Sequence, residues 1–339
     1  MSLKVKEHIH VPVLNGLRAM AAIMVCMYHA AFLFSADLPL LVRILDWGQE
    51  GVYVFFVISG VVMPLALDRM NYGMKDFKHF ILKRLLRLQP PLIVSAAVMT
   101  LISYQTLKQL EVSSIVLFAG SASLTAPLLG LPFVNDIYWT LFVEMQYYLY
   151  IALLFPFLMR ANPKRRWTII LVLLAASFTS LLFEVKWIKL VLPFHLPVFL
   201  IGFFLFLRMS GRIGKREFVA GVGLCAFCCA LLTGYFHELG YRITFAALAT
   251  VLFICCIRNS PAWLNRIGEY SYSLYLFHWL FISLMAHYVR PYIPGLWGSI
   301  FLYLFIISMA IAGSKIFYWA IEKPSLNWAK KMGLQYRQK

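Results

Sequence analysis

The chain has 339 residues, of which 62% are hydrophobic and 13% are charged. Soluble domains average roughly 45–50% apolar and about 25% charged residues, so this composition excludes an ordinary soluble protein. A formal net charge of +17 would suggest nucleic-acid binding in a soluble protein. Here the Lys and Arg residues lie mostly in short segments between apolar stretches, which favours a membrane protein that binds no nucleic acid.

Apolar stretches of about 20 residues recur along the chain, and they predict an all-α polytopic membrane protein with about ten transmembrane helices. Residues 113–132 are rich in Gly, Ser and Pro, so we expect a re-entrant or surface loop there rather than a full span. The predicted spans lie at 13–35, 50–68, 88–107, 138–158, 167–184, 188–208, 217–235, 243–257, 267–289 and 297–320.

The distribution of Lys and Arg predicts that both termini face the cytoplasm. With that orientation, 24 of these residues lie on the cytoplasmic side or at its boundary, and 6 lie in outer loops, as the positive-inside rule requires. We find no internal repeat and no linker, so we expect one membrane domain over 1–339 with no fused soluble domain. The six cysteines lie in apolar spans, where cysteine behaves as a small hydrophobe, and we expect no metal site.

Two polar residues interrupt the first span. Arg18 and His29 stand 11 residues apart, which is about 16 Å along a helix, so Arg18 would lie near the cytoplasmic boundary and His29 in the outer half. Glu144 of the fourth span lies about 9 Å below its outer end by the same rise, at a depth similar to that of His29. A His–carboxylate pair can act as a general base or simply hold two helices together, and the spacing favours neither.

Arg84 and Arg87 form a second candidate site at the cytoplasmic end of the third span. Residues three apart share one face of a helix, and two guanidinium groups on one face suit phosphate binding. An ordinary positively charged flank of a membrane helix has the same pattern, so both interpretations stay open.

Polar side chains also follow a helical spacing in the ninth span. Ser271, Leu274, Tyr275 and His278 share one face, which therefore carries a hydroxyl, a phenol and an imidazole. A buried histidine with satisfied hydrogen bonds is the alternative for His278.

Two further polar residues lie within spans. His195 stands between two prolines, whose freed carbonyl groups it could satisfy, so we expect a structural role for it. Lys315 could pair with an acidic group or line a polar cavity.

Six sequence blocks follow one another along the chain: GLRAMAAIMVCMYHA at 16–30, GVYVFFVISGVVM at 51–63, KRLLRLQPP at 83–91, YWTLFVEMQYYLY at 138–150, YSYSLYLFHWL at 270–280 and IEKPSLNW at 321–328. The series opens with a basic residue, ten residues and then a histidine, continues with R-x-x-R, and closes with E-x-P. Together these blocks resemble the acyltransferase-3 family of integral membrane O-acyltransferases, which modify bacterial glycans and some small molecules. The resemblance covers almost the whole chain.

The resemblance implies an acyl-CoA donor, usually acetyl-CoA, that enters from the cytoplasm as a co-substrate, and no permanently bound cofactor. Arg18, Arg84 and Arg87 would then bind the CoA phosphates. His29 would remove the proton of the acceptor hydroxyl, with Glu144 orienting it and balancing its charge. Direct transfer and an acyl-histidine intermediate both stay open. The residues expected to line the pore or to donate to the oxyanion are Trp139, Thr140, Tyr148, Ser271, Tyr275 and His278.

The acceptor expected from the resemblance is a cell-surface glycan or its lipid-linked precursor, in the bacterial cytoplasmic membrane. A small-molecule or lipid acceptor is the first alternative. A polytopic transporter with an intramembrane proton relay is the second, although it predicts an inverted repeat that we do not find. The sequence does not distinguish acetyl from longer acyl groups, and it does not indicate an oligomeric state.

Overall fold

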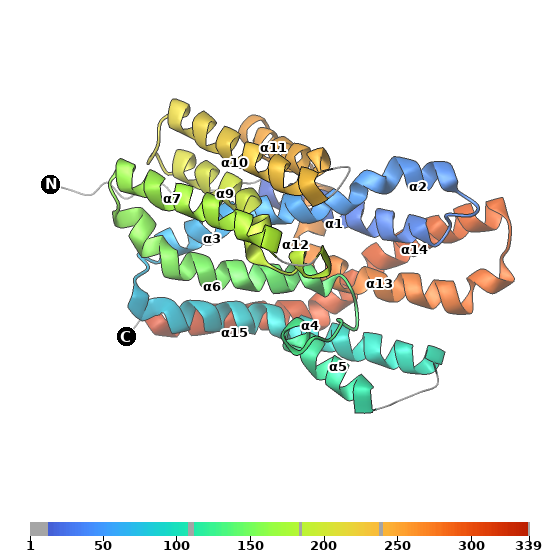
Figure 1. Cartoon of the computed structure of the whole chain (residues 1–339). Helices are drawn as coiled ribbons and strands as arrows, with labels where there is room; N and C mark the ends of the chain where they lie inside the picture. The colour runs from blue at the N-terminus through green and yellow to red at the C-terminus, as the bar shows by residue number, and fades with distance from the viewer. Residues whose placement is uncertain (1–12, 108–111, 183–184, 237–239, 338–339) are drawn as a thin grey trace. The chain divides into compact units, whose positions relative to one another are not determined.

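In the computed structural model, residues 13–107, 112–182, 185–236 and 240–337 are described, and every regular element among them is a helix (Figure 1). The predicted all-α class is confirmed. Short 3-10 segments join several helices, and a π-helical turn, Tyr318–Glu322, joins the last two. The α-helices are α1 (Val13–Phe32), α2 (Pro39–Leu45), α3 (Gly51–Arg69), α4 (Phe77–Leu107), α5 (Val112–Ala122), α6 (Tyr138–Arg160), α7 (Pro163–Ser177), α8 (Val185–Ile188), α9 (Leu192–Met209), α10 (Lys215–Phe236), α11 (Tyr241–Cys256), α12 (Ala262–Glu269), α13 (Ser271–Tyr288), α14 (Leu296–Phe317) and α15 (Lys323–Arg337).

Eight stretches of the described residues are long and apolar enough to cross a membrane, where the sequence predicted ten. The eight do not include α11, which has 16 residues, or α13, which has 18. Serine, tyrosine and histidine side chains in α13 lower its hydropathy, although it is as long as α9. The chain is therefore a polytopic membrane protein. The cytoplasmic placement of its termini stays a prediction.

The predicted boundaries agree within a few residues for α1, α3, α6 and α10. The largest error is in the third span, which we expected to begin at residue 88. Its helix, α4, begins at Phe77 and continues through Pro90 and Pro91. The predicted span 267–289 was also too long, because the chain breaks at Tyr270 between α12 and α13.

The chain divides into two compact units, each assembled from three segments. Unit 1 comprises Met1–Ala19, Tyr53–Tyr72 and Leu154–Gly268, and unit 2 comprises Met20–Val52, Gly73–Leu153 and Glu269–Lys339. Helices α1, α3 and α6 contribute residues to both units. We describe each unit by itself, and the expected single domain over 1–339 stays a prediction.

Helix α9 is the centre of unit 1, where it packs against α7, α10 and α11. It crosses α3 at a pair of glycines. A Cβ atom on Gly60 would lie 2.2 Å from the carbonyl oxygen of Phe199, and one on Gly202 would lie 2.2 Å from that of Val57. Only glycine permits this approach of two helix backbones.

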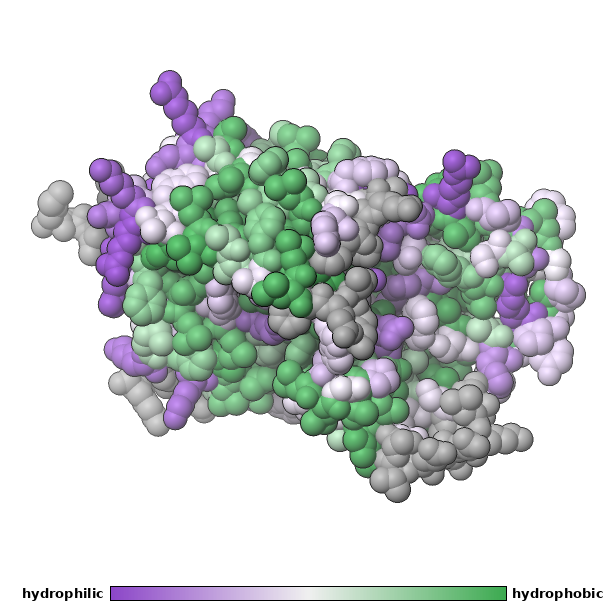
Figure 2. Space-filling model, in the orientation of Figure 1, coloured by the Kyte–Doolittle hydropathy of each residue, from purple (hydrophilic) through white to green (hydrophobic). Residues whose placement is uncertain are grey.

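The outward faces of unit 1 are apolar. Figure 2 shows a largely hydrophobic surface over α7 and α10. Leu171 and Val172 of α7 and Phe227 and Leu231 of α10 are exposed. A helix that is apolar both inside and outside is typical of a membrane span, because lipid rather than water covers its outer face.

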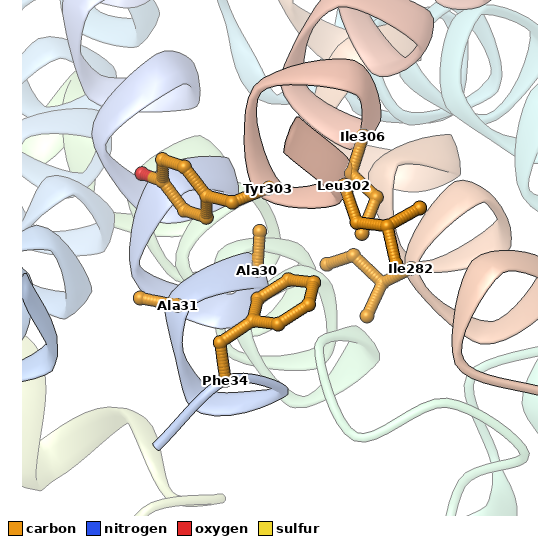
Figure 3. Packing of buried hydrophobic residues seen from close by; sticks show 7 residues of the cluster. All are labelled: Ala30, Ala31, Phe34, Ile282, Leu302, Tyr303 and Ile306. Carbon is orange, nitrogen blue, oxygen red and sulfur yellow. The ribbon is translucent and has the colours of Figure 1, made fainter. Parts of the chain in front are cut away.

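The core of unit 2 packs α1 against α13 and α14. Its buried cluster consists of side chains from these three helices and of Phe34, which lies in the turn after α1 (Figure 3). The rings of Phe34 and Tyr303 meet edge to face with centroids 6.3 Å apart. Small residues on α1 allow the close packing. The cluster members are Ala30, Ala31, Phe34, Ile282, Leu302, Tyr303 and Ile306.

The double proline of α4 does not end the helix because other side chains satisfy the carbonyl groups around it. Pro90 and Pro91 have no N–H, so the carbonyl groups one turn earlier, including that of Arg87, lose their usual donors. The Ser325 hydroxyl lies 3.1 Å from the Arg87 carbonyl oxygen, and the Tyr272 hydroxyl donates to the Leu88 carbonyl at 2.8 Å. The helix is continuous, but its ladder of backbone hydrogen bonds is interrupted at the prolines. Helices α13 and α15 stabilise α4 at this break in its hydrogen bonding.

Residues 113–132 do not form a full span, as predicted, but much of the segment is helical rather than the expected loop. Helix α5 has only 11 residues and packs against α4. The side-chain amide of Gln89 donates to the carbonyl of Ala122 at its end, and the Ser121 hydroxyl accepts from the Val134 N–H at 2.8 Å. These bonds satisfy backbone groups at the end of α5 and in the loop that follows.

Candidate functional site

The first element of the site is a pair of histidines in unit 2. Nδ1 of His29, on α1, lies 2.9 Å from Nε2 of His278, on α13. His278 is completely buried and His29 is half-buried. Sequence reasoning singled out both residues but did not pair them, because helical spacing says which residues share a face and not which faces meet.

The hydrogen bonds of His278 determine the proton positions in this pair. Its Nδ1 lies 2.7 Å from the carbonyl oxygen of Tyr275 and 3.2 Å from that of Leu274. A carbonyl only accepts, so Nδ1 of His278 is the protonated nitrogen and Nε2 of the neutral ring is an acceptor. His29 therefore donates from Nδ1, and the lone pair of its neutral ring is at Nε2.

Aromatic rings surround His29. The Trp279 ring meets it edge-on with centroids 5.1 Å apart, and the Tyr28 ring is also at 5.1 Å. Tyr28 in turn donates from its hydroxyl to Gln49 at 3.4 Å. These rings restrict the orientation of the His29 imidazole.

Helix α6 contacts α13 one turn before His278. The Tyr275 hydroxyl donates to the Ile137 carbonyl at 3.0 Å and lies 2.7 Å from the Thr140 hydroxyl. Both side chains are buried, and their hydroxyl groups bond to each other and to the backbone. They anchor α13 to α6, and the pore or oxyanion role predicted for them stays a prediction.

Glu144 belongs to a second polar group. Its carboxylate accepts from the Tyr148 hydroxyl at 2.5 Å, and the Arg84 guanidinium carbon lies 5.8 Å from the centre of the Tyr148 ring. The same guanidinium lies 5.4 Å from the Phe80 ring. The structure thus brings the predicted residues Arg84, Glu144 and Tyr148 into one cluster.

The two polar groups lie at different levels along the helices. Helices α6 and α13 run in opposite directions (Figure 1) and touch at Thr140 and Tyr275. From that contact Glu144 is one turn along α6, and His278 is one turn along α13 in the opposite sense. At about 1.5 Å per residue the offset is roughly 10 Å. The pairing of His29 with Glu144 stays a prediction, whereas the observed bond of His29 goes to His278.

Sequence reasoning missed the role of Glu322. The carboxylate of this buried residue accepts from the Ser273 N–H at 3.1 Å and from the Ser273 hydroxyl at 2.7 Å. Ser273 is in the first turn of α13, where backbone N–H groups have no partner within the helix. Glu322 therefore caps α13 from the π-helical turn. Its signal in the sequence is the closing E-x-P block, which by itself indicates no partner for the carboxylate.

The remaining predicted residues lie as follows. Arg87, on α4, is half-buried, Trp139 is half-buried at the start of α6, and Ser271 is fully buried at the start of α13. Arg18 is half-buried on α1 but belongs to unit 1. Lys315 is exposed in the last turn of α14, where a long side chain can reach the membrane interface, so it does not line a buried cavity.

His195 is enclosed within unit 1. Its Nε2 lies 3.0 Å from the Lys189 carbonyl oxygen, and the ring centroids of Phe194 and Phe56 lie 5.0 and 5.3 Å away. A buried ring between a carbonyl group and aromatic neighbours is what we expected of a structural histidine.

Comparisons with known proteins identify a family and several relatives of this chain. A family model described as "Acyltransferase domain" matches residues 11–319. The chain is 27% identical to the peptidoglycan O-acetyltransferase OatA of Listeria monocytogenes, over 86% of this chain and 52% of OatA. It is 24% identical to a provisionally named O-acetyltransferase of Staphylococcus aureus, over 96% of this chain and 60% of that protein. It is 25% identical to YrhL of Bacillus subtilis, provisionally named a peptidoglycan O-acetyltransferase, over 95% of this chain and 56% of YrhL.

The chain spans between about half and three fifths of the length of these relatives. No solved structure matches it. Because the family model covers nearly the whole chain, including both histidines, Glu144 and the arginines of α4, the chain belongs to the acyltransferase-3 family of membrane proteins.

Proposed function

We propose that the protein is a membrane O-acyltransferase. It transfers an acyl group, acetyl in the first instance, from acyl-CoA to a hydroxyl group of a cell-surface glycan or its lipid-linked precursor. The observation that carries the proposal is the bond between His29 and His278, because it directs an imidazole lone pair away from its neutral partner. The names of the Listeria and Bacillus relatives support a glycan acceptor.

In this proposal His29 is the general base. Its Nε2 takes the proton of the acceptor hydroxyl as the O–H bond breaks, and the oxygen forms a new bond to the thioester carbonyl carbon. The C–S bond then breaks, and the proton on Nε2 passes to the CoA sulfur, which regenerates neutral His29. Trp139, beside the contact between α6 and α13, is the proposed donor to the oxyanion, and Ser271 stays a predicted pore residue.

Arg84 and Arg87 of unit 2 are the proposed phosphate-binding residues. Arg18, which belongs to unit 1, keeps its predicted phosphate-binding role as a separate proposal. Guanidinium groups bind phosphate through charge-assisted bonds. Glu144 and Tyr148 are proposed to orient Arg84, since Glu144 accepts from Tyr148 and Tyr148 lies against Arg84. The charge of Glu144 partly offsets that of the arginine cluster. The bacterial cytoplasmic membrane is the proposed location, since acyl-CoA is cytoplasmic.

The test is acetyl transfer in membranes that contain the protein and its bacterial glycan. With radiolabelled acetyl-CoA, we expect alkali-labile label in the glycan fraction, and His29→Ala should lower it by about 10²- to 10⁴-fold, the range of general-base catalysis. Arg84→Ala should instead weaken binding of acetyl-CoA to the purified protein. His195→Asn is the matched histidine control and should transfer normally.

Each alternative has its own outcome. Label in a small molecule or a lipid with none in glycan would identify the other acceptor class. Substrate uptake into vesicles without CoA would favour the transporter. Full transfer by His29→Ala would overturn the assigned base.

A further inference from the structure

The second histidine of the pair has no step of its own in the proposed reaction. His278 is completely buried, lies on the helix that Glu322 caps, and bonds to backbone carbonyl groups on one side and to His29 on the other. A ring held in this way cannot rotate without breaking bonds on both sides. It is therefore well placed to control a neighbouring group rather than to react.

We propose that His278 is a positioning residue that fixes the tautomer of His29, so that the base is Nε2 of His29 and not Nδ1. This inference rests on the proposed transfer reaction.

The hydrogen-bond chain runs in one direction. The Tyr275 and Leu274 carbonyl groups accept the Nδ1 proton of His278, which leaves only a lone pair at Nε2 to face His29. His29 must then keep its own proton on Nδ1. A proton on Nε2 of His278 would reverse this bond and move the proton of His29 to its Nε2, so the stated direction belongs to a neutral His278.

The rest of α13 holds the carbonyl groups that set this chain. The Tyr275 side chain is anchored to α6 through Ile137 and Thr140. One turn earlier, the Tyr272 hydroxyl is anchored to the backbone of α4. His278 is consequently the last link of a polar network that begins in the protein backbone and ends at the reacting histidine.

The role differs from the pore or oxyanion role expected for His278 from the sequence. An oxyanion donor must direct a proton toward the substrate, but both nitrogens of His278 are engaged within the protein. Positioning of a base by a partner that fixes its tautomer is worth about 10⁴-fold in the serine-protease triad, where the wrong tautomer abolishes the base.

The first test compares His278→Leu with His278→Gln. Leucine removes the acceptor for His29, so kcat should fall by about 10²- to 10⁴-fold, while the Kd for acetyl-CoA measured on purified protein should change less than about twofold. Glutamine supplies a side-chain carbonyl at similar reach and should restore part of kcat. The acid limb of the pH profile of kcat/KM should move in His278→Leu, because that limb reports the base.

The matched control is His195→Leu, which removes the other fully buried histidine. It should lower thermal stability without moving kcat per folded molecule or the pH profile. Equal pH profiles for wild type and His278→Leu, or no gain with glutamine over leucine, would overturn the proposal.

A second measurement does not depend on turnover. The ¹⁵N resonances of histidine-labelled protein in detergent should show His29 protonated at Nδ1 and unprotonated at Nε2, with the pattern lost in His278→Leu. An unprotonated Nδ1 in the wild type would overturn the tautomer assignment. If the tautomer is as expected but no acetyl transfer is found, the proposed reaction fails while the positioning of His29 by His278 stands.

Discussion

Helices α9 and α13 have the same length, 18 residues, and each carries one buried histidine, but the protein holds them in place by different means. In unit 1, α9 buries 15 residues, and His195 is the only ionisable one among them. In unit 2, α13 buries 11, including two serines, two tyrosines and His278. Apolar packing therefore positions α9, whereas α13 is positioned by hydrogen bonds in addition to apolar packing.

The difference explains why His278, and not His195, is part of the proposed site. A helix fixed by apolar packing tolerates a polar group only where it is enclosed, as His195 is by aromatic rings and a carbonyl. A helix fixed by hydrogen bonds can carry a directed chain of donors and acceptors to a reacting group. Polar groups in a membrane interior are costly, so a helix that concentrates them points to function.

The largest effect is expected at the glycine crossing of α9. Gly202→Ala places a methyl group 2.2 Å from the Val57 carbonyl oxygen, a backbone atom that cannot move aside. We expect the free energy of unfolding to fall by at least the roughly 1–3 kcal/mol typical of overpacking, with kcat per folded molecule unchanged. Thermal unfolding in detergent measures this loss of stability.

Gly223→Ala on α10 is the matched control, because no atom lies within 4 Å of the position of its Cβ. Alanine is the better helix former, so this variant should be stabilised by about 0.5–1 kcal/mol. Equal stability of the two variants would contradict the view that α9 is positioned by close backbone contact.

The next effect is expected at the cap of α13. Glu322→Ala leaves the Ser273 N–H and hydroxyl without their buried acceptor, which should cost about 1–3 kcal/mol of stability. Unlike Gly202→Ala, it should also lower kcat, because the carbonyl groups that hold His278, those of Leu274 and Tyr275, directly follow Ser273. Glu322→Gln keeps one acceptor oxygen and should lose less. A Glu322→Ala variant with lower stability but normal kcat would show that α13 does not need its cap for the reaction.

The comparison also shows what the sequence could predict. Long apolar stretches predicted the bounds of α1, α6 and α10 closely, because the thickness of the membrane fixes the length of a spanning helix. The start of α4 was wrong because the basic residues before residue 88 mark the end of a membrane span and not the end of the helix. The side chains that bond to its carbonyl groups near the double proline, Ser325 and Tyr272, are about 180 or more residues away in sequence. Distant partners of this kind are invisible in local spacing.

The same limit applies to the site. Spacing and resemblance selected His29, His278, Glu144 and Arg84, and the structure places the first two in contact and groups the last two around Tyr148. The sequence spacing put His29 and the carboxylate of Glu144 at a similar depth in the membrane and so paired them. It could not show the rotation of each helix about its axis, and that rotation decides that α1 turns His29 toward α13.

The smallest effect is expected where α15 stabilises the break in α4. The Ser325 hydroxyl proton is shared between the carbonyl groups of Arg87, at 3.1 Å, and Glu322, at 2.8 Å. Ser325→Ala should therefore cost only about 0.5–1.5 kcal/mol, the net value of one hydrogen bond. Because Arg84 and Arg87 lie on the helical turns next to this break, the variant should raise the KM for acetyl-CoA about two- to tenfold and leave kcat unchanged.

Ser308→Ala on α14 is the control, since its exposed hydroxyl bonds to the carbonyl one turn earlier and its loss should change stability by less than about 0.5 kcal/mol. An unchanged KM in Ser325→Ala would separate the support of α4 from donor binding, whereas a fall in kcat would mean that this bond also positions the histidine pair.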